Sequence, residues 1–338
     1  MRTLFLLVFS ILSLTISAQE IEVIETGMKN SFRGLSVVND RIIWVSGNNG
    51  TVGRSLDSGK TWQWMVVKGF EKTDFRDIEA FDEKTAVILG ISEPAFILKT
   101  FNGGENWKVV YSDSSKGVFL DAMEFWDDSH GMAVGDPIDS NLYIVQTVDF
   151  GNRWKRFPAQ KLDKPTKGEA FFASSGTNIR ALNRDQAVMI TGGLKSSILL
   201  SGKLYPLPVL QGTESRGANS IAVWFRGINT QRMVVVGGDF SKPDLDSNNC
   251  FYTTDLAKTW KAPVTGPKGY RSCVEFIDKN TLITCGLNGV DISYDGAENW
   301  KKISSASFHV CRRSKKGESV FLAGGNGKLG RLKTAGKL

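Results

Sequence analysis

Four short segments of the sequence place an arginine directly after an aromatic residue or a serine. A guanidinium group stays charged and presents several N–H donors in a fixed fork, which suits carboxylates and other anionic oxygens. If the segments are equivalent positions of a repeated structure, their arginines converge and repel one another unless negative charge lies close by. The four residues are Arg33, Arg76, Arg216 and Arg271.

Two sources of negative charge could balance these arginines, and the sequence leaves both open. The first is internal, because aspartates lie in or beside comparable segments and could form ion pairs with the arginines. The second is an anionic ligand, such as an acidic carbohydrate, or a protein partner. We expect one ligand-binding or partner-binding set around a common centre, made of Arg33, Arg76, Asp77, Asp121, Asp136, Arg216, Asp239, Arg271 and His309.

The carboxylates could instead catalyse glycoside hydrolysis. That reaction uses two carboxyl groups about 5 to 10 Å apart, or a tyrosine nucleophile in sialidase-like enzymes. No spacing in the sequence singles out a pair, so hydrolysis is the alternative to a binding function without catalysis. Its candidate residues are Asp77, Asp121, Glu124, Asp136, Asp239 and Tyr270.

The composition argues against several other classes of function. The chain has 338 residues, with 42 Lys and Arg against 35 Asp and Glu, two His and four Cys. Without a Cys-x-x-Cys spacing, and with His130 and His309 alone, we expect no metal site. The net charge of +7 is dispersed along the chain, so we expect no nucleic-acid partner. The 41% of hydrophobic residues indicates a globular protein.

Residues 1–18 have the pattern of a secretory signal peptide. Arg2 precedes an apolar run from Leu4 to Ile16, and small residues precede Gln19. The run is shorter than the roughly 20 residues that span a bilayer, and no later segment comes close. We expect cleavage after Ala18 and a secreted or periplasmic protein. Residues 19–338 would form a single domain without a transmembrane segment.

Five copies of one eight-residue pattern indicate that the chain is built from repeats. Each copy has Ser or Thr, then Asp or Asn at the third place, Gly or Ala at the fifth and Trp at the eighth. The Asp or Asn can accept hydrogen bonds from backbone N–H groups of a turn, and Gly supplies a positive φ. We therefore assign structural roles to Asp57, Asn102, Asp149, Asp255 and Asp295, and to Trp62, Trp107, Trp154, Trp260 and Trp300 as packing residues between neighbouring sheets.

A second marker counts the repeats. Apolar runs rich in β-branched residues end in glycine seven times, about every 46 residues, a length that suits a four-stranded sheet. This predicts an all-β fold, a seven-bladed β-propeller, with six blades and an insertion near residues 155–210 as the alternative. Residues 21–24 should supply the outer strand of the last blade and close the ring. The seven glycines are Gly47, Gly90, Gly135, Gly192, Gly237, Gly286 and Gly324.

The eight-residue pattern resembles the Asp-box, or bacterial neuraminidase (BNR) repeat, which lies on the turn between the third and fourth strands of a propeller blade. Segments 124–126, 135–137, 173–177, 237–240 and 293–295 also resemble bacterial members of the photosystem II assembly and stability factor-like family, often labelled oxidoreductases. Sialidases are similar at a greater distance. The resemblance implies a scaffold that grips a partner protein through an arginine-rich face without catalysis. It does not carry over the photosynthetic partner.

Two remaining sequence features concern a cofactor and the cysteines. Gly325, Gly327 and Gly330 match a dinucleotide-binding string, but a helix must follow it to meet the pyrophosphate, and only eight residues remain. We expect a turn between strands there and no cofactor. A hairpin turning at Lys279 would place Cys273 opposite Cys285, either as free thiols or as a disulfide.

Overall fold

The computed structural model describes residues 19–183, 186–225 and 231–333. The expected signal peptide, residues 1–18, lies outside the described residues. Within them the fold is built from β-strands, and its one helical element is a single 3-10 turn, η1 (Ala159–Lys161). This confirms the predicted all-β class.

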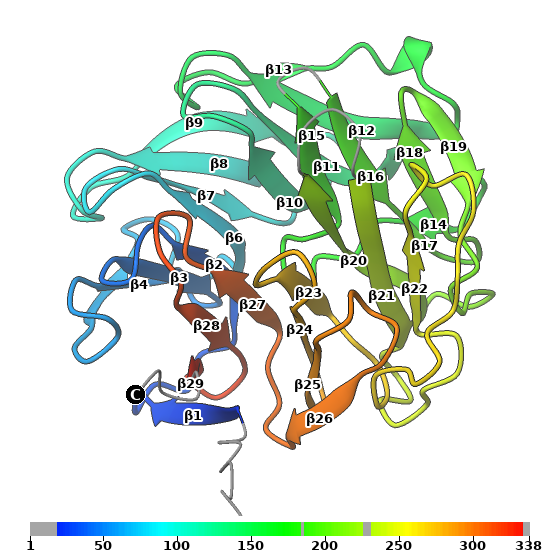
Figure 1. Ribbon diagram of the computed structural model, residues 1–338. Coiled ribbons are helices and arrows are strands. Elements are labelled where there is room, and N and C mark those ends of the chain that lie inside the picture. Colours follow the sequence, from blue (N-terminus) through cyan, green and yellow to red (C-terminus); the bar gives the residue numbers. More distant parts are fainter. Residues whose placement is uncertain (1–18, 184–185, 226–230, 334–338) are drawn as a thin grey trace, which may run out of the picture.

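Seven antiparallel sheets form the blades of a propeller, and Figure 1 shows them arranged around a common centre. The alternative of six blades is therefore excluded. The first three blades consist of consecutive strands: β2 (Phe32–Val37), β3 (Ile43–Gly47), β4 (Thr51–Ser55) and β5 (Gln63–Val66); β6 (Phe75–Ala80), β7 (Ala86–Gly90), β8 (Ala95–Thr100) and β9 (Lys108–Asp113); and β10 (Leu120–Phe125), β11 (Gly131–Ile138), β12 (Asn141–Thr147) and β13 (Lys155–Arg156).

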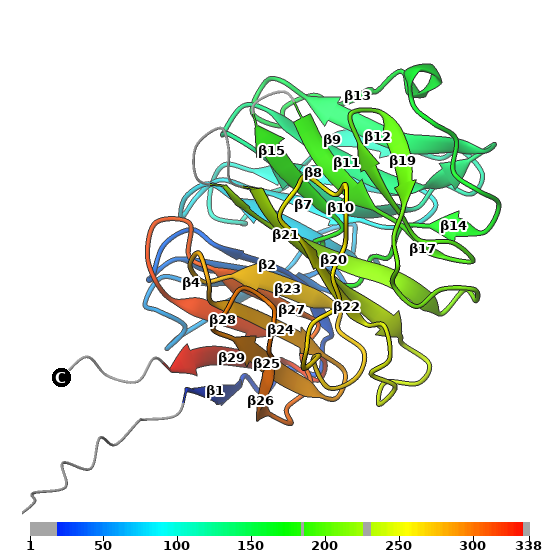
Figure 2. The same cartoon turned by 45° about the vertical axis from the view of Figure 1, so that its right-hand side comes forward.

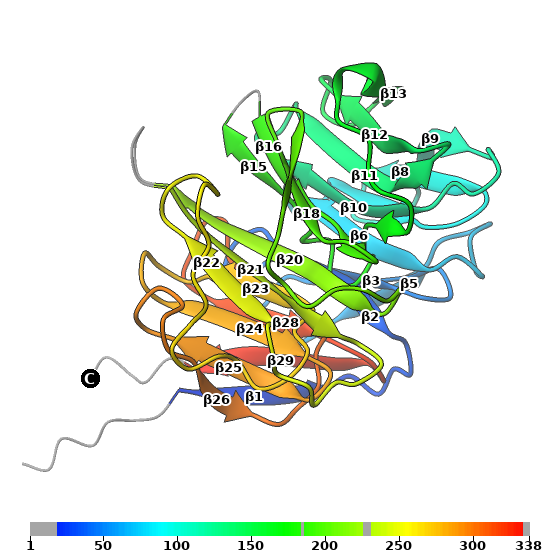
Figure 3. The same cartoon turned by 90° about the vertical axis from the view of Figure 1, so that its right-hand side faces the viewer.

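The fourth and fifth blades depart from this simple order. The fourth blade pairs β15 (Ile179–Asn183), β16 (Gln186–Ile190), β18 (Ser197–Leu200) and β19 (Lys203–Pro206). The fifth blade contains β20 (Arg216–Phe225), β21 (Gln231–Asp239) and β22 (Cys250–Thr253). Two short strands, β14 (Glu169–Ala170) and β17 (Gly192–Gly193), extend it beside β20. Figure 3 shows the third and fourth blades in green at one end of the molecule and the sixth and seventh in orange and red at the other.

The N-terminal strand closes the ring. The sixth blade is β23 (Cys273–Phe276), β24 (Leu282–Gly286), β25 (Gly289–Ser293) and β26 (Lys301–Ser304). The seventh joins β27 (Val310–Arg313), β28 (Val320–Ala323) and β29 (Lys328–Lys333) to β1 (Glu20–Glu25). β1 is antiparallel to β29, with Ile21 opposite Leu332, and Figure 2 shows the two strands side by side. The expected pairing of the two ends of the chain is thus present.

The glycine-ended runs belong to the second strand of each blade or follow it directly. These strands are almost wholly buried; for example, β3, β7 and β24 have no exposed residue. Their aliphatic side chains pack between neighbouring blades, as where Val87 and Leu89 of the second blade meet Leu120 and Ala133 of the third. Burial of this apolar surface between blades is the main force that holds the disc together.

The five pattern turns share one set of hydrogen bonds. In each turn the Asp or Asn accepts from a backbone N–H four residues later, as from Thr61 to Asp57 at 2.9 Å and from Asn106 to Asn102 at 3.0 Å. The Ser or Thr hydroxyl donates to the same side chain, as Ser55 does to Asp57. These contacts place the five residues in turns between third and fourth strands, with hydrogen bonds that stabilise the turns.

The four cysteines are buried free thiols. Cys273 on β23 lies opposite Cys285 on β24, so the predicted hairpin is confirmed and the disulfide alternative is not realised. Gly325 and Gly327 lie at the turn between β28 and β29, as expected for a strand connection.

Candidate functional site

The first strand of each blade lies nearest the axis, and each contacts the first strand of the next blade around the whole ring. A cavity opens at each end of these strands. The front mouth, where the strands begin, has a volume of about 390 Å³ and is lined by Arg33, Arg76, Asp121, Tyr270 and His309, among others. The rear mouth, where they end, has a volume of about 430 Å³ and includes Glu79, Glu124, Arg180, Glu275 and Arg312.

A β-bulge at the start of the first strands selects which side chains reach the front mouth. In four blades, one residue of the first strand has no partner on the second strand. It directly follows the residue that pairs with the glycine of the glycine-ended run. In the first blade Phe32 pairs with Gly47 and Gly34 with Ser46. A bulge re-aims the skipped side chain. The skipped residues are Arg33, Arg76, Asp121 and Asn219.

Arg271 does not belong to this set, and its predicted place at the channel mouth is wrong. Cys273 pairs with Cys285, directly before Gly286, so Ser272 takes the place of Arg33 and Arg271 takes that of Phe32. Arg271 is fully buried and binds Asp291 through Nε at 2.8 Å and also through Nη2. The Tyr270-Arg271 pair thus lies one residue earlier in its blade than Phe32-Arg33 does in the first blade.

Arg216 and Asp239 also lie outside the cavity. They face each other at the ends of β20 and β21, and Arg216 Nε donates to Asp239 Oδ2 at 2.9 Å. Burial opposes ionisation of Asp239, but hydrogen bonds from Ser241 and Arg216 outweigh it and hold the pKa well below its ordinary value. This pair matches the expectation of internal ion pairing, and neither residue lines the front mouth.

Arg33 is the cation of the front mouth that lacks a carboxylate. No ion pair joins it to any of the described residues, and its Nη1 donates to the backbone carbonyl of Ser174 at 3.2 Å. Burial and the neighbouring charge of Arg76 lower the pKa of Arg33. A lowered arginine pKa means that the charged form lacks compensation, so a ligand oxygen would relieve it.

Arg76, beside it, is partly satisfied. Its Nε pairs with Asp74 at 2.8 Å, its Nη1 donates to the carbonyl of Ala173 at 3.4 Å, and its guanidinium lies 6.0 Å from the ring of Phe119. Among the described residues, the Asp74 carboxylate is thus the one that forms an ion pair with either Arg33 or Arg76.

Residues 171–177, which lead into the fourth blade, lie between the two mouths. Ser174 and Ser175 are buried, and Ser175 Oγ donates to the carbonyl of Ser272 at 2.7 Å. From the rear, Arg312 Nη2 donates to the carbonyls of Ser175 and Gly176 at 3.3 and 3.2 Å. Gly176 has φ of +65°, and a Cβ there would lie 2.3 Å from the carboxyl carbon of Asp77. Only glycine fits this position, and the segment closes the channel.

Asp121 and Asp136 form an acidic wall of the front mouth. Asp121 is fully buried, and neither of its carboxylate oxygens forms a hydrogen bond with a described residue. Burial and the charge of Asp136 raise the pKa of Asp121 well above its ordinary value, although Arg76 and the backbone N–H groups of Ala173 and Asp136 oppose this. Burial likewise raises the pKa of Asp136 to about 6, against a hydrogen bond of 3.0 Å from the Phe171 N–H.

His309 lies on the side of Arg33. Its Nε2 is 3.2 Å from Ser31 Oγ, and its Nδ1 is buried without a hydrogen bond to the described residues. Burial and the charges of Arg33 and Arg76 lower its pKa to about 3, so the imidazole is neutral at physiological pH.

Aromatic side chains complete the walls of the front mouth. Phe119, Phe171, Phe172, Phe240 and Tyr270 all line it. Phe240 meets Phe172 and Tyr270 edge to face, with ring centroids 5.9 and 6.3 Å apart. A cavity with apolar walls and a few convergent charged groups is the usual form of a ligand site.

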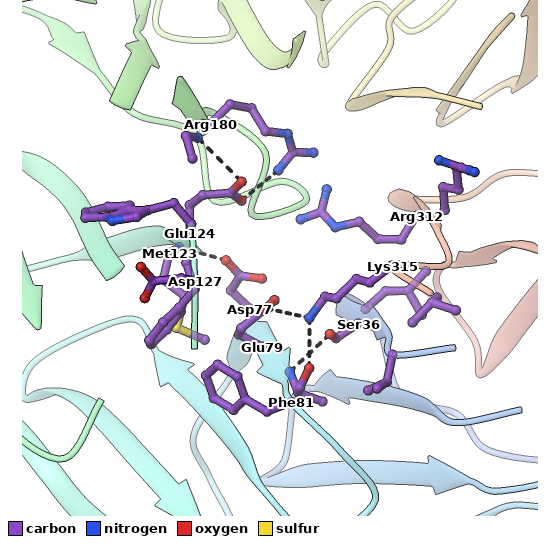
Figure 4. A pocket seen from close by; sticks show the side chains of 18 of the residues that line it. Ser36, Asp77, Glu79, Phe81, Met123, Glu124, Asp127, Arg180, Arg312 and Lys315 are labelled. Carbon is purple, nitrogen blue, oxygen red and sulfur yellow. Dashed lines mark hydrogen bonds and ion pairs between the residues drawn. The ribbon is translucent and has the colours of Figure 1, made fainter. Parts of the chain in front are cut away.

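The rear mouth differs because cations there are paired with carboxylates, as Figure 4 shows for Arg180 with Glu124 and for Lys315 with Glu79. Arg180 crosses the opening, with Nη1 3.2 Å from Glu124 and Nη2 3.1 Å from Glu275. Lys315 pairs with Glu79 and donates to the carbonyl of Ala80 at 2.8 Å. These contacts join the third, fourth and sixth blades, and the seventh to the second.

The structure places two further predicted residues at the rear mouth. Asp77 is buried at its floor and accepts hydrogen bonds from the N–H groups of Ile78 and Met123, at 2.9 and 2.8 Å. Burial raises the pKa of Asp77 to about 7. Asp77 and Glu124 therefore lie apart from the front-mouth set, which keeps Arg33, Arg76, Asp121, Asp136, Tyr270 and His309.

Sequence reasoning missed the rear-mouth cations and the backbone carbonyls of residues 173–176. Arg180 is the second residue of β15 and Arg312 the third residue of β27, and both line the rear mouth. In the part of the chain that the structure describes, no group of three or more His, Cys, Asp or Glu could hold a metal ion. The described residues contain no helix long and apolar enough to cross a membrane.

Comparisons with known proteins identify the fold. No family model and no curated protein matches this chain. The solved structure "YCF48 bound to D1 peptide" matches with a TM-score of 0.65 at 17% identity, over 95% of this chain and 99% of that chain. YCF48 from Cyanidioschyzon merolae matches with a TM-score of 0.60 at 17% identity, over 93% and 98%. The Neurospora crassa Pan2 WD40 domain matches with 0.61 at 12% identity, over 91% and 90%.

Proposed function

We propose that this protein is an exported binding or assembly scaffold without catalytic activity, which holds an acidic segment of a protein partner at the front mouth. Arg33 and Arg76 provide the contacts to the acidic group, and the aromatic walls receive its apolar surroundings. The observation that carries the proposal is the charge of Arg33, which is partly buried beside Arg76 and has a single carbonyl oxygen as its hydrogen-bond partner among the described residues.

The rear mouth provides the comparison that makes the unpaired charge of Arg33 informative. There Arg180 and Lys315 each form an ion pair with a carboxylate of another blade. The two mouths belong to the same ring of strands, so a lack of carboxylates around Arg33 is not a general property of the channel. A buried cation without a counter-charge costs stability and is retained where it binds something.

Two further points support a protein partner. The front mouth is lined by five aromatic residues as well as arginine, residue types that are enriched at interfaces between proteins. In addition, one YCF48 structure of similar fold is described as bound to D1 peptide. Export rests on the signal-like residues 1–18.

Affinity capture from the envelope fraction of the native cell tests the proposal. The wild-type protein and an Arg33→Ala/Arg76→Ala variant are immobilised, and captured proteins are identified by mass spectrometry. We expect a partner that the wild-type protein retains and the variant loses, with retention that weakens as salt is raised. Acidic segments of that partner, as blocked synthetic peptides, should then bind the wild-type protein directly.

The matched control removes the same charge elsewhere. Arg153→Ala/Lys155→Ala takes two exposed positive side chains from the outer edge of the third blade. It should capture the partner as the wild-type protein does. Equal capture by the front-mouth variant, or equal loss in the control, would reject the front mouth as the binding site.

A glycoside hydrolase remains the second candidate, because Asp121 and Asp136 line one cavity with aromatic walls and both have raised pKa values. A carboxyl group with a raised pKa is what the general acid of such an enzyme needs. Turnover of aryl glycosides that is lost in Asp121→Asn and Asp136→Asn would favour this candidate over the scaffold.

A further inference from the structure

The front mouth holds unpaired groups of two opposite kinds. Arg33 is a cation without a carboxylate partner among the described residues. Asp121 of the third blade is fully buried, and neither of its oxygens accepts a hydrogen bond of ordinary geometry from the described residues, although the N–H groups of Ala173 and Asp136 act to lower its pKa. Buried polar groups are normally paired, so a pair of such groups in one cavity indicates that something else completes them.

The arginines of the front mouth do not neutralise the negative charge of Asp121 and Asp136. Arg76 is the cation whose charge reaches Asp121, and it is already paired with Asp74 at 2.8 Å. Asp136 follows Gly135, the ladder partner of Leu120, so Asp121 and Asp136 leave neighbouring strands at the same end of the third blade. The two carboxyl groups thus form one acceptor surface, which lacks a donor of matching charge.

We propose that the front mouth recognises a dipolar group, with a carboxylate bound by Arg33 and an ammonium group bound by Asp121, as in an α-amino acid with an apolar side chain. The inference rests on the proposed function, because it uses Arg33 as the contact to the anion. It adds Asp121 as the residue that selects ligands with a positive group beside the negative one.

The size and walls of the cavity suit this ligand class. A volume of about 390 Å³ lies at the lower end of the range for small-molecule sites. Phe119, Phe240 and Tyr270 offer ring surfaces to an apolar side chain. A free amino acid offers the required chemistry, and so does a partner segment in which an acidic and a basic side chain lie close together.

Calorimetric titration of the purified protein tests separately whether binding requires the carboxylate and the ammonium group of the ligand. The probes are phenylalanine, N-acetylphenylalanine, which lacks the ammonium group, and phenylalanine amide, which lacks the carboxylate. A blocked tripeptide Asp-Phe-Lys and its Asp-Phe-Ala counterpart test the second source. We expect at least one dipolar probe to bind about tenfold more tightly than its single-charge counterparts.

Two front-mouth variants test which side chain binds which charged group of the probe. Asp121→Asn should bring the affinity for the dipolar probe down to that for the probe without an ammonium group, whereas Arg33→Ala should abolish the preference over the amide. Asp136→Asn serves as the second acid variant if Asp121→Asn fails to fold. Arg153→Ala, on the outer edge of the third blade, should leave every affinity unchanged.

Preference for phenylalanine assigns the site to free amino acids, and preference for the Asp-Phe-Lys peptide assigns it to a partner segment. No preference for any dipolar probe, or a preference that survives Asp121→Asn, overturns the inference. Partner capture that depends on Arg33 and Arg76 while Asp121→Asn has no effect would leave the proposed function standing without this refinement.

Discussion

Arg33 of the first blade donates from Nη1 to the backbone carbonyl of Ser174, 3.2 Å away in the segment that leads into the fourth blade. This bond crosses the channel and holds the closing segment under the front mouth. A carbonyl dipole compensates a guanidinium charge less than a carboxylate does, so the positive potential of Arg33 remains available to a ligand. The same contact therefore closes the channel and leaves the mouth charged.

Asp77 should give the protein a distinctive dependence of stability on pH. Burial raises the pKa of Asp77 to about 7 in the folded protein, from an ordinary value of 3.8. The folded state then binds this proton more tightly than the unfolded state does, so the stabilisation present at low pH is lost as the pH rises from about 4 to about 7. Asp77→Asn, which cannot ionise, should lack this loss.

Urea unfolding of both proteins at pH values of about 5 and about 8 measures the effect. We expect the free energy of unfolding of Asp77→Asn, relative to the wild type, to increase by about 1 to 4 kcal/mol between these two values. Glu79 and Glu275 are present in both proteins, so the difference between the proteins isolates Asp77. Parallel dependence on pH in the two proteins would contradict a raised pKa of Asp77 in the folded protein.

Asp149 represents the five pattern turns. It accepts hydrogen bonds from Thr147 Oγ1 and from the Arg153 N–H at 3.0 and 2.9 Å. Asp149→Ala loses both, and we expect the free energy of unfolding to fall by about 1 to 2 kcal/mol. Asp149→Asn should be close to the wild type, because Asn102 makes the same contacts in the second blade. Thermal and chemical unfolding of the two variants would decide; equal losses would mean that the charge, and not the acceptor, matters.

The number of blades could be predicted from the sequence, but the positions of several site residues could not. Glycine-ended apolar runs mark second strands because burial between blades imposes one local pattern on each repeat. The places of Arg33 and Arg271 depend on a one-residue bulge, and nothing in the local sequence distinguishes Phe32 from Tyr270 as the residue before it. The carbonyl of Ser174 carries no side-chain signal at all, so its contact with Arg33 requires the fold.

The thiols should be inaccessible until the protein unfolds. Cys250, Cys273, Cys285 and Cys311 are free and buried, with at most 2% of the residue surface exposed. A thiol reagent such as Ellman's should find no reactive group in the native protein and four in denaturant. Two groups in denaturant under non-reducing conditions would indicate that Cys273 has joined to a neighbouring cysteine in the isolated protein.

Arg271 should contribute strongly to stability, in contrast to Arg33. Arg271 and Asp291 are both fully buried and paired, so Arg271→Ala leaves an uncompensated carboxylate in the core of the sixth blade. Loss of one partner of such a pair typically costs about 3 to 5 kcal/mol. Arg33→Ala removes one hydrogen bond to a carbonyl and relieves repulsion from Arg76, so its cost should be about 1 kcal/mol or less.

The double variant Arg271→Ala/Asp291→Ala separates loss of the pair from loss of packing. Removing the second charge from a site where the first is already missing should restore part of the stability, so the two single losses should not add. Urea unfolding of the four proteins of this cycle measures the coupling energy. Additive losses, or an Arg271→Ala variant as stable as Arg33→Ala, would mean that water reaches Asp291 and that Arg271 lies nearer the channel surface than the register of β23 and β24 places it.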